Sequence, residues 1–221
     1  MSGLGAVNRT TLREQVLAQL RESILDGTLP PGTKMAEVDL AAQFGVSRGT
    51  VREALRYLQQ SGLLEGEERL SLRVRRLSPV EIVELFNVRA ALEGQAMRDI
   101  INNPDRERLI DELEKRLPVV ESEMPYAQRF LIDLQFHEEL CRLGGNSVLL
   151  TMWESVKDLM RMAVIAPEDE ESVQLMSPAH HRPILDALRA GDPDRALTVI
   201  RDHMGGAAQS WAARAQLAYA S

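Results

Sequence analysis

The sequence of 221 residues is poor in cysteine and in aromatic side chains, and it has no long apolar run. Its single cysteine excludes a disulfide framework within the chain and is typical of a protein in a reducing compartment. No apolar run approaches the roughly 18 residues of a transmembrane helix, and the N-terminus MSGLGAVNRT lacks the apolar segment of a signal peptide. We therefore expect a soluble, cytoplasmic protein without a membrane partner.

Alanine, leucine, glutamate and arginine are abundant instead, and 44% of the residues are hydrophobic, so we expect a mainly α-helical protein with a substantial core. The net charge of −7 is unevenly distributed. Residues 1–79 hold 11 basic and 9 acidic side chains, a net of +2, whereas residues 80–221 hold 15 and 24, a net of −9. The acidity therefore belongs to the second part of the chain and does not argue against DNA binding by the first.

The stretch from Leu40 to Leu58 has the pattern of two short helices joined by a tight turn. Gly45 can adopt the left-handed conformation that ends the first helix, and Ser47 stands where the second helix needs an N-cap oxygen. The inward face of that second helix carries apolar residues at i, i+4 and i+7: Val51, Leu55 and Leu58. Its opposite face carries three arginines at i, i+4 and i+8: Arg48, Arg52 and Arg56.

A helix that docks by one face and presents cationic side chains on the other meets the requirements of a DNA recognition helix. An ordinary amphipathic helix with a solvated arginine face is the alternative for an isolated segment. The preceding short helix, the glycine turn and the cap favour the recognition helix.

Further elements are predicted on either side of this pair. Thr11 and Glu14 have the spacing of a capping box, and an apolar stripe follows it: Leu12, Val16, Leu20 and Ile24. After the second helix, Leu72 and Val74 alternate with arginines, a period of two that is typical of a strand. Residues 63–76 are therefore predicted to form a β-hairpin wing.

Residues 80–221 are predicted to form an all-helical domain. Ser78, Pro79 and Glu81 fit the N-cap, N1 and N3 positions of a helix start. The expected helices are Val80–Ile101, Asp105–Leu117, Pro125–Leu143, Ser147–Ile165, Ala179–Ala190 and Pro193–Ala218. The acidic run EDEE at 168–171 is expected to be a solvated loop, and the whole domain a bundle of six or seven helices.

This domain contains a carboxylate and histidines at helical spacing. Asp133 and His137 lie at i and i+4 and therefore share one helix face, where an ordinary surface hydrogen bond is the commoner arrangement. His181 and His203 lie on the last two helices, each with apolar neighbours at helical spacing. Spacing alone does not bring these helices onto Asp133.

The run GTLPPGTKMAEVDLAAQFGVSRGTVREALRYLQQSGLL resembles the winged helix-turn-helix of GntR-family transcription regulators. The resemblance covers roughly residues 11–76, within a DNA-binding domain of residues 1–76, and its VSR-x-x-VREAL core is specific. It implies that Ser47, Arg48, Thr50 and Arg52 contact double-stranded operator DNA. The chain departs from the family at 49–50, where Gly-Thr replaces the commoner Thr-Pro, and in its acidic wing tip, EGEER at 65–69. Because one recognition helix reads only a few base pairs, tight binding is expected to require a homodimer.

The pattern D-x-x-x-H, then H-R-x-I-L-x-A-L-x-x-G-D, then a late helical histidine, resembles the FCD ligand-binding domain of the FadR-like GntR branch. In that domain an aspartate and three histidines coordinate a divalent cation. The resemblance implies that the ligands here are Asp133, His137, His181 and His203, which leaves His180 as the one non-ligand histidine. Imidazole and carboxylate suit Zn²⁺, Ni²⁺, Mn²⁺ or Fe²⁺, and the ligand set does not choose among them.

Arg89 has two interpretations. From the residues alone it is an exposed arginine that pairs with Glu93 at i+4. The R-x-x-LE pattern of the family implies instead an inward arginine that pairs with the carboxylate of an effector. We therefore expect the effector to be a small organic acid, a class that includes hydroxy and keto acids.

Two classes of function follow, with a third as a variant. The first is a homodimeric DNA-binding transcription regulator controlled by a carboxylic-acid metabolite at a divalent metal. The second is a metal-dependent hydrolase, in which open metal positions would activate water. We expect no enzyme, because the sequence offers no separate general base or nucleophile motif. The third is a regulator for which the metal ion itself is the signal.

Overall fold

The computed structural model describes residues 11–66, 72–119, 124–163 and 170–220. The chain divides after Arg76 into two compact units, which are described separately below. The fold is mainly α-helical with one small sheet, as the sequence predicts. In the described part of the chain, no helix combines the length and the apolar character needed to cross a membrane.

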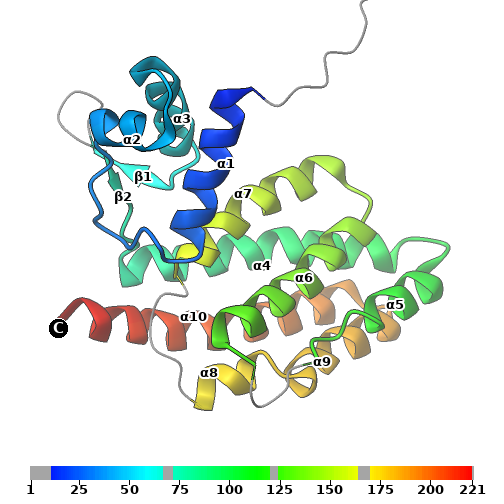
Figure 1. Cartoon of the computed structure of the whole chain (residues 1–221). Coiled ribbons are helices and arrows are strands. Elements are labelled where there is room, and N and C mark those ends of the chain that lie inside the picture. Colours follow the sequence, from blue (N-terminus) through cyan, green and yellow to red (C-terminus); the bar gives the residue numbers. More distant parts are fainter. Residues whose placement is uncertain (1–10, 67–71, 120–123, 164–169, 221) are drawn as a thin grey trace, which may run out of the picture. The chain divides into compact units, whose positions relative to one another are not determined.

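The described part of the first unit consists of three helices and a short hairpin (Figure 1). Its elements in chain order are α1 (Leu12–Leu25), α2 (Glu37–Phe44), α3 (Arg48–Gln60), β1 (Leu64–Glu65) and β2 (Arg73–Val74). The predicted capping box starts α1, with Glu14 N donating to Thr11 Oγ1 and Thr11 N donating to Glu14 Oε2. Helix α1 packs against α3 through buried residues of both helices. The prediction that Leu12 belongs to the apolar stripe is wrong, because its side chain is 61% exposed in the first turn of α1.

The turn between α2 and α3 has the predicted chemistry. Gly45 ends α2 in the left-handed conformation at φ 64°. Ser47 then caps α3, its Oγ accepting from Thr50 N at 3.1 Å. Helix α2 begins at Glu37, three residues before the predicted stretch, and this extension brings an acidic side chain to the start of the pair.

The hairpin pairs β1 and β2 in antiparallel register, Leu64 with Val74 and Glu65 with Arg73. An additional bridge joins Lys34 to Arg73, so the segment before α2 supports the second strand in a way that local alternation did not predict. The wing-tip residues at 67–69 lie outside the described residues.

The second unit is a bundle whose seven described helices run from α4 to α10 (Figure 1). They are α4 (Pro79–Ile101), α5 (Arg106–Glu114), α6 (Tyr126–Leu143), α7 (Ser147–Ala163), α8 (Glu170–Leu175), α9 (Pro178–Ala190) and α10 (Pro193–Ala220). Ser78 and Glu81 form the capping box that starts α4. The expectation of a loop through 168–171 is wrong at its end, because Glu170 begins the short helix α8, and 168–169 lie outside the described residues. The predicted helix end at Ile165 also lies outside them.

Helix α4 contacts α6, α7, α9 and α10, so it lies at the centre of the bundle. Gly94 allows α10 to approach it closely, since a Cβ at that position would lie 2.7 Å from Leu197 Cδ1. Together with the packing of α6 and α9 on α4, this approach leaves buried polar side chains of α4, α6, α9 and α10 facing one region. The polar side chains in that region form the site described next.

Candidate functional site

Four potential metal ligands converge inside the second unit from three helices. Asp133 and His137 lie one turn apart on α6, His181 lies on α9 and His203 on α10. All four are buried, with exposures of 6%, 1%, 0% and 8% respectively. The bundle therefore brings together the complete set of residues that the resemblance implies.

The ligand atoms of this cluster lie close to one another. His137 Nε2 lies 3.2 Å from His181 Nε2 and 3.3 Å from His203 Nε2. Asp133 Oδ1 lies 3.0 Å from His181 Nε2, and Asp133 Oδ2 lies 3.9 Å from His137 Nε2. Zn²⁺ binds nitrogen at about 2.0–2.1 Å, and ligands at 90–110° around such an ion are separated by about 3.0–3.4 Å. Three of these four distances fall in that range, and the nitrogens of the three histidines all lie within 4.8 Å of one another, so the histidines fit a divalent cation, with Asp133 beside two of them.

The three histidines differ in what supports the other ring nitrogen. His137 Nδ1 lies 2.6 Å from Glu93 Oε2, and His181 Nδ1 lies 2.8 Å from the carbonyl oxygen of Ser177. His203 Nδ1 is buried without a hydrogen-bond partner in the part of the chain that the structure describes. Partners of the first two kinds leave Nε2 free to bind a metal.

Burial controls the protonation of the cluster. It lowers the pKa of His137, although Glu93 beside it acts in the opposite direction, and it lowers the pKa of His203 well below the ordinary value. Burial alone would raise the pKa of Asp133, but the hydrogen bond from His181 and the nearby positive groups hold it below its ordinary value. Burial thus favours the neutral forms of His137 and His203, and the neighbours of Asp133 favour its ionised form, which are the forms that bind metal.

His180 has a different environment. Its ring stacks on that of His203, with centroids 4.3 Å apart and planes inclined at 28°. Burial lowers the pKa of His180, and its Nε2 is buried without a partner among the described residues. It supports the ring of His203 from the side and lies outside the convergent group.

Arg89 is buried on α4, with 2% of its surface exposed, so the interpretation as an exposed arginine is wrong. It does pair with Glu93, Nε donating to Oε1 at 3.0 Å, but Glu93 is also fully buried. The i,i+4 spacing identified the pair, whereas its burial depends on the helices packed around α4. Arg89 Nη2 has no hydrogen-bond partner in the described ranges.

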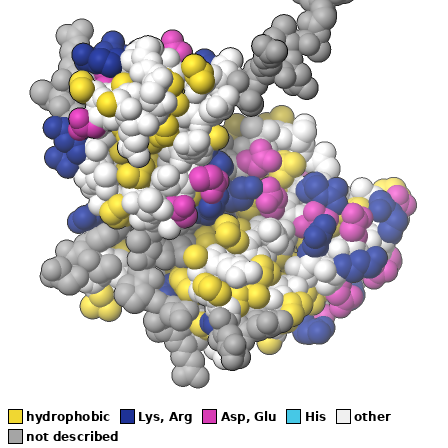
Figure 2. Space-filling model, in the orientation of Figure 1, with side chains coloured by type: hydrophobic (Ala, Val, Ile, Leu, Met, Phe, Trp, Pro, Cys, Tyr) yellow, Lys and Arg dark blue, Asp and Glu magenta, His cyan; other side chains and the backbone are white. Residues whose placement is uncertain are grey.

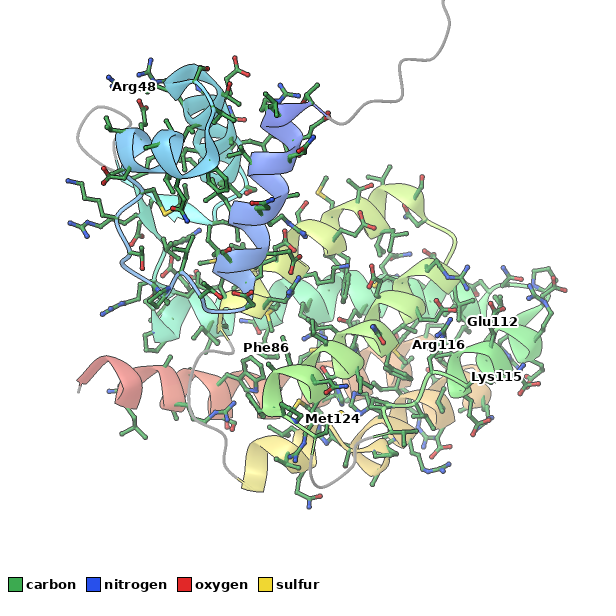
Figure 3. All side chains as sticks on the ribbon, in the orientation of Figure 1. Arg48, Phe86, Glu112, Lys115, Arg116 and Met124 are labelled. Carbon is green, nitrogen blue, oxygen red and sulfur yellow. The ribbon has the colours of Figure 1, made fainter. Side chains whose placement is uncertain are left out.

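A small pocket of about 20 Å³ lies beside this arginine. Its polar wall is formed by Arg89, Asp133, His137 and His203, and its apolar wall includes Phe86, Phe130 and Trp211. Figure 3 labels Phe86, which extends from α4 and lies edge-on to the Trp211 ring at 5.8 Å between centroids. The pocket therefore combines three of the four candidate metal ligands, a guanidinium nitrogen without a partner among the described residues, and an aromatic wall.

Sequence reasoning missed two residues that complete the site. The sequence analysis considered Glu93 only as the surface partner of Arg89, and it did not consider Trp153. Trp153 lies on α7, and its Nε1 donates to Glu93 Oε1 at 3.0 Å. A buried carboxylate whose hydrogen-bond partners come from three helices leaves no local pattern in the sequence. Only its i,i+4 spacing to Arg89 could have indicated it.

The predicted DNA-contacting residues lie together at the start of α3. Ser47 and Thr50 join their hydroxyl oxygens at 2.9 Å. The side chains of Arg48 and Arg52 are 63% and 59% exposed, and Figure 3 shows Arg48 directed outward at the edge of the unit. Figure 2 shows lysine and arginine side chains along this outer edge with acidic side chains among them.

Glu37, on α2, is the acidic side chain next to these arginines. Its Oε1 and Oε2 accept from Arg52 Nε and Nη2, each at 2.8 Å, and Oε2 lies 3.8 Å from Arg48 Nη2. The hydrogen bond from Arg52 holds the pKa of Glu37 below its ordinary value. The arginine face of α3 is thus oriented by an acid that sequence periodicity did not connect to it.

Comparison with known proteins gives consistent matches along the chain. Residues 12–74 match the profile of bacterial regulatory proteins of the gntR family, and residues 84–206 match the FCD domain. The chain is 34% identical over 203 residues to a probable D-xylose utilization operon transcriptional repressor of Paenarthrobacter nicotinovorans, covering 90% of this chain and 88% of that one. It is 31% identical over 154 residues to the gluconate operon transcriptional repressor of Bacillus subtilis strain 168, covering 68% and 63%.

Solved structures are similar over nearly the whole length. E. coli McbR/YncC superposes with a TM-score of 0.69 at 22% identity, covering 96% of this chain and 100% of that chain, which supports the fold alone. A GntR transcriptional regulator from Rhodococcus sp. RHA1 superposes with a TM-score of 0.66 at 25% identity, covering 91% and 98%.

Proposed function

This chain belongs to the GntR family of bacterial regulatory proteins, and we propose that a small carboxylic acid, held beside a divalent cation in its FCD domain, controls its binding to operator DNA. The regulator class itself is established by the family, since the chain is a DNA-binding transcription regulator with an FCD domain. The proposal concerns the residues, the cation, the effector and the assembly.

For DNA, we assign the contacts to Ser47, Arg48, Thr50 and Arg52 at the start of α3. Their support is the position of α3 after a glycine turn and the exposure of both guanidinium groups. Arginine reads guanine through two hydrogen bonds in the major groove. Because a single α3 contacts only a few base pairs, the proposed active form is a homodimer on a two-fold-related operator, in the cytoplasm where bacterial DNA lies.

For the cation, we assign Asp133, His137, His181 and His203 as the ligands, with Zn²⁺, Ni²⁺, Mn²⁺ or Fe²⁺ as the ion. The support is the set of four distances between their donor atoms, which run from 3.0 to 3.9 Å, and the burial of all four residues. When bound, the cation supplies positive charge and open coordination positions for an anionic ligand. The protein residues hold this charge at one end of the pocket.

For the effector, the observation that carries the proposal is Arg89 Nη2, a buried donor without a partner among the described residues, in a pocket whose wall includes three of the four proposed ligands. Among Arg89, Glu93 and Asp133 the negative charges exceed the positive by one, and a divalent cation reverses that excess. One bound carboxylate then balances the site. The carboxylate would accept from Arg89 at one oxygen and face the cation at the other.

The names of the relatives narrow the chemistry of the effector. The names of two relatives concern D-xylose utilization and gluconate, which are a five-carbon sugar and a six-carbon sugar acid. A hydroxy acid such as gluconate carries both the carboxylate that Arg89 would pair with and a hydroxyl that can chelate beside it. We therefore place a polyhydroxy or keto acid first among the candidates.

The alternatives are less well supported. A metal-dependent hydrolase is not favoured, because the matched families and relatives are transcription regulators. A metal sensor would need the cluster but not the neighbouring arginine pocket. Titrating metal into an operator-binding assay with and without organic acids distinguishes the sensor from the effector-controlled regulator.

Calorimetry tests the effector proposal with gluconate, pyruvate, acetate and the neutral sugar D-xylose as probes. We expect an acid, and not D-xylose, to bind the zinc-loaded protein. Arg89→Lys, which keeps the charge but loses the planar fork, should weaken binding about 10–100-fold, because a hydrogen bond to a charged group is worth about 1.5–3 kcal/mol. Arg108→Ala, at a 66% exposed arginine on α5, serves as the matched control. Acid binding that survives both the Arg89 substitution and metal removal would exclude the pocket as the effector site.

A further inference from the structure

We propose that Glu93 is a positioning residue that ties the cation site to the effector arginine, so that one buried carboxylate controls both metal affinity and the placement of Arg89. This inference rests on the proposed function and adds a residue and a means of regulation to it. Glu93 itself contacts neither the proposed cation nor the proposed acid.

The geometry of Glu93 uses both of its oxygens. Oε2 lies 2.6 Å from His137 Nδ1, whereas Oε1 accepts from Arg89 Nε and from Trp153 Nε1, each at 3.0 Å. The carboxylate is fully buried, and its three partners come from α4, α6 and α7. No water is needed to satisfy it, so its orientation is determined by protein groups on three sides.

This arrangement specifies the tautomer of His137. An ionised carboxylate only accepts hydrogen bonds, and a buried charge next to Arg89 is stable when it is paired in this way. The proton of a neutral His137 must then lie on Nδ1, which leaves the lone pair of Nε2 directed at the convergent cluster. A carboxylate behind a metal-bound histidine also increases its basicity as a ligand.

The three histidines are not equivalent in this respect. His181 is supported by the neutral carbonyl of Ser177, and His203 Nδ1 has no partner among the described residues. Within the described part of the chain, Glu93 is thus the anionic partner behind the cluster. Its loss should affect metal binding more than the loss of a neutral support.

The same carboxylate holds the effector arginine. Through Nε, Glu93 directs the guanidinium so that Nη2 remains available toward the pocket that Asp133 and His137 also line. A ligand that pairs with Arg89 is therefore connected to the proposed metal ligand His137 through Glu93, which bonds to both residues. Metal and acid should bind cooperatively, and by thermodynamic reciprocity each should raise the affinity of the other by the same factor.

The test uses the full-length chain and Zn²⁺, with affinity measured by competition against a chromophoric chelator. Glu93→Gln keeps the size of the side chain but places an amide donor where one of the three donors points. We expect Zn²⁺ affinity to fall about 10–100-fold, and the cooperativity between Zn²⁺ and gluconate to be lost. Trp153→Phe removes one donor to Oε1 and keeps the carboxylate, so it should change Zn²⁺ affinity less than threefold.

A second measurement does not depend on the folding of a variant. Nitrogen-15 NMR of the histidine side chains in zinc-loaded wild type should show His137 protonated at Nδ1. If Nδ1 of His137 carries no proton, or if a folded Glu93→Gln protein binds Zn²⁺ as tightly as wild type, Glu93 has no positioning role. If wild type and His181→Ala bind Zn²⁺ equally weakly, the metal site of the proposed function fails, and that outcome is distinct because it appears without any change at Glu93.

Discussion

Each unit of this protein holds an arginine–glutamate pair beside its proposed binding site, and the two pairs differ in exposure. Arg52 donates two hydrogen bonds to Glu37 at 2.8 Å while 59% of its side chain is exposed. Arg89 donates one to Glu93 at 3.0 Å, with exposures of 2% and 0%. The chemistry of the two pairs is the same, but the surrounding dielectric is not.

The difference suits what each site has to do. An exposed ion pair is worth about 0–1 kcal/mol, so Arg52 can exchange Glu37 for a base edge or a phosphate at small cost. A buried pair that loses one partner leaves an uncompensated charge, so Arg89 and Glu93 hold each other in place before any ligand arrives. The proposed DNA-binding surface is thus held by exchangeable contacts, and the proposed inner site by preorganised ones.

Removing the acid from each pair tests this comparison most strongly. Glu93→Ala should lower the free energy of unfolding of the second unit by about 3–5 kcal/mol, because it strands the buried Arg89. The matched substitution Glu37→Ala should cost less than about 1 kcal/mol. Urea unfolding followed by tryptophan fluorescence reports the second unit, since Trp153 and Trp211 both lie there, and far-UV circular dichroism reports the whole chain. Equal losses in the two variants would contradict the distinction.

Metal removal should have the next largest effect. A cation that binds the folded chain alone stabilises it by about 2.7 kcal/mol at a hundredfold excess over the dissociation constant. A chelator should therefore lower the melting temperature of wild type and leave that of His181→Ala nearly unchanged. Thermal unfolding of both proteins with and without chelator measures this, and elemental analysis of protein never exposed to chelator should find stoichiometric metal. Absence of metal in such protein would count against the cluster as a cation site.

On the surface side, Arg52→Ala should weaken specific operator binding by about 1–3 kcal/mol, the value of a good arginine–guanine contact. Glu37→Gln should act in the opposite direction on non-specific DNA, because it removes a negative charge that neutralises Arg48 and Arg52. Fluorescence anisotropy with operator and with unrelated DNA, at equal salt, separates the two effects. An Arg52→Ala protein that binds the operator as tightly as wild type would show that α3 is not the recognition helix.

Lowering the pH should have the smallest effect, a loss of stability in the metal-free protein. The pKa of His203 is held well below its ordinary value by burial, whereas in the unfolded chain it titrates near 6.5. As the pH falls below about 6.5, the unfolded state takes up protons that the folded state resists. The metal-free protein therefore loses stability, by about 1 kcal/mol per histidine at one pH unit below that value. Urea unfolding of chelator-treated wild type and His203→Gln at about pH 7.5 and about pH 5.5 should give a shallower pH dependence in the variant. Parallel dependences would mean that His203 contributes nothing to it.

Features with short sequence separation were predictable. The capping boxes of Thr11 with Glu14 and of Ser78 with Glu81, the left-handed Gly45 and the Ser47 cap all lie where spacing predicted them. Each depends on hydrogen bonds or steric limits within about four residues, which a sequence displays directly. The mainly helical fold and its division into a helix-turn-helix part and a bundle followed from the same local signals.

Predictions failed where contacts between distant parts of the chain determine the local structure or the exposure of a side chain. The segment at Lys34 pairs with Arg73 across 39 positions, and among the described residues no element buries Leu12 in the first turn of α1. Helix α8 starts within an acidic run that local composition assigned to a loop. In each case the deciding contact, or its absence, involves residues that the local pattern does not contain.

The sequence by itself determined the helices, their caps, the arginine face of α3 and the one-turn spacings of Asp133 with His137 and of Arg89 with Glu93. The tertiary structure alone decided that α6, α9 and α10 bring four donor atoms together, and that the Arg89–Glu93 pair is buried rather than solvated. The physical reason is that helical periodicity orders side chains along one axis, whereas burial and coordination depend on which other helices pack against that axis. Glu93 illustrates both parts: its distance from Arg89 is local, but its bonds to His137 and Trp153 exist only in the packed bundle.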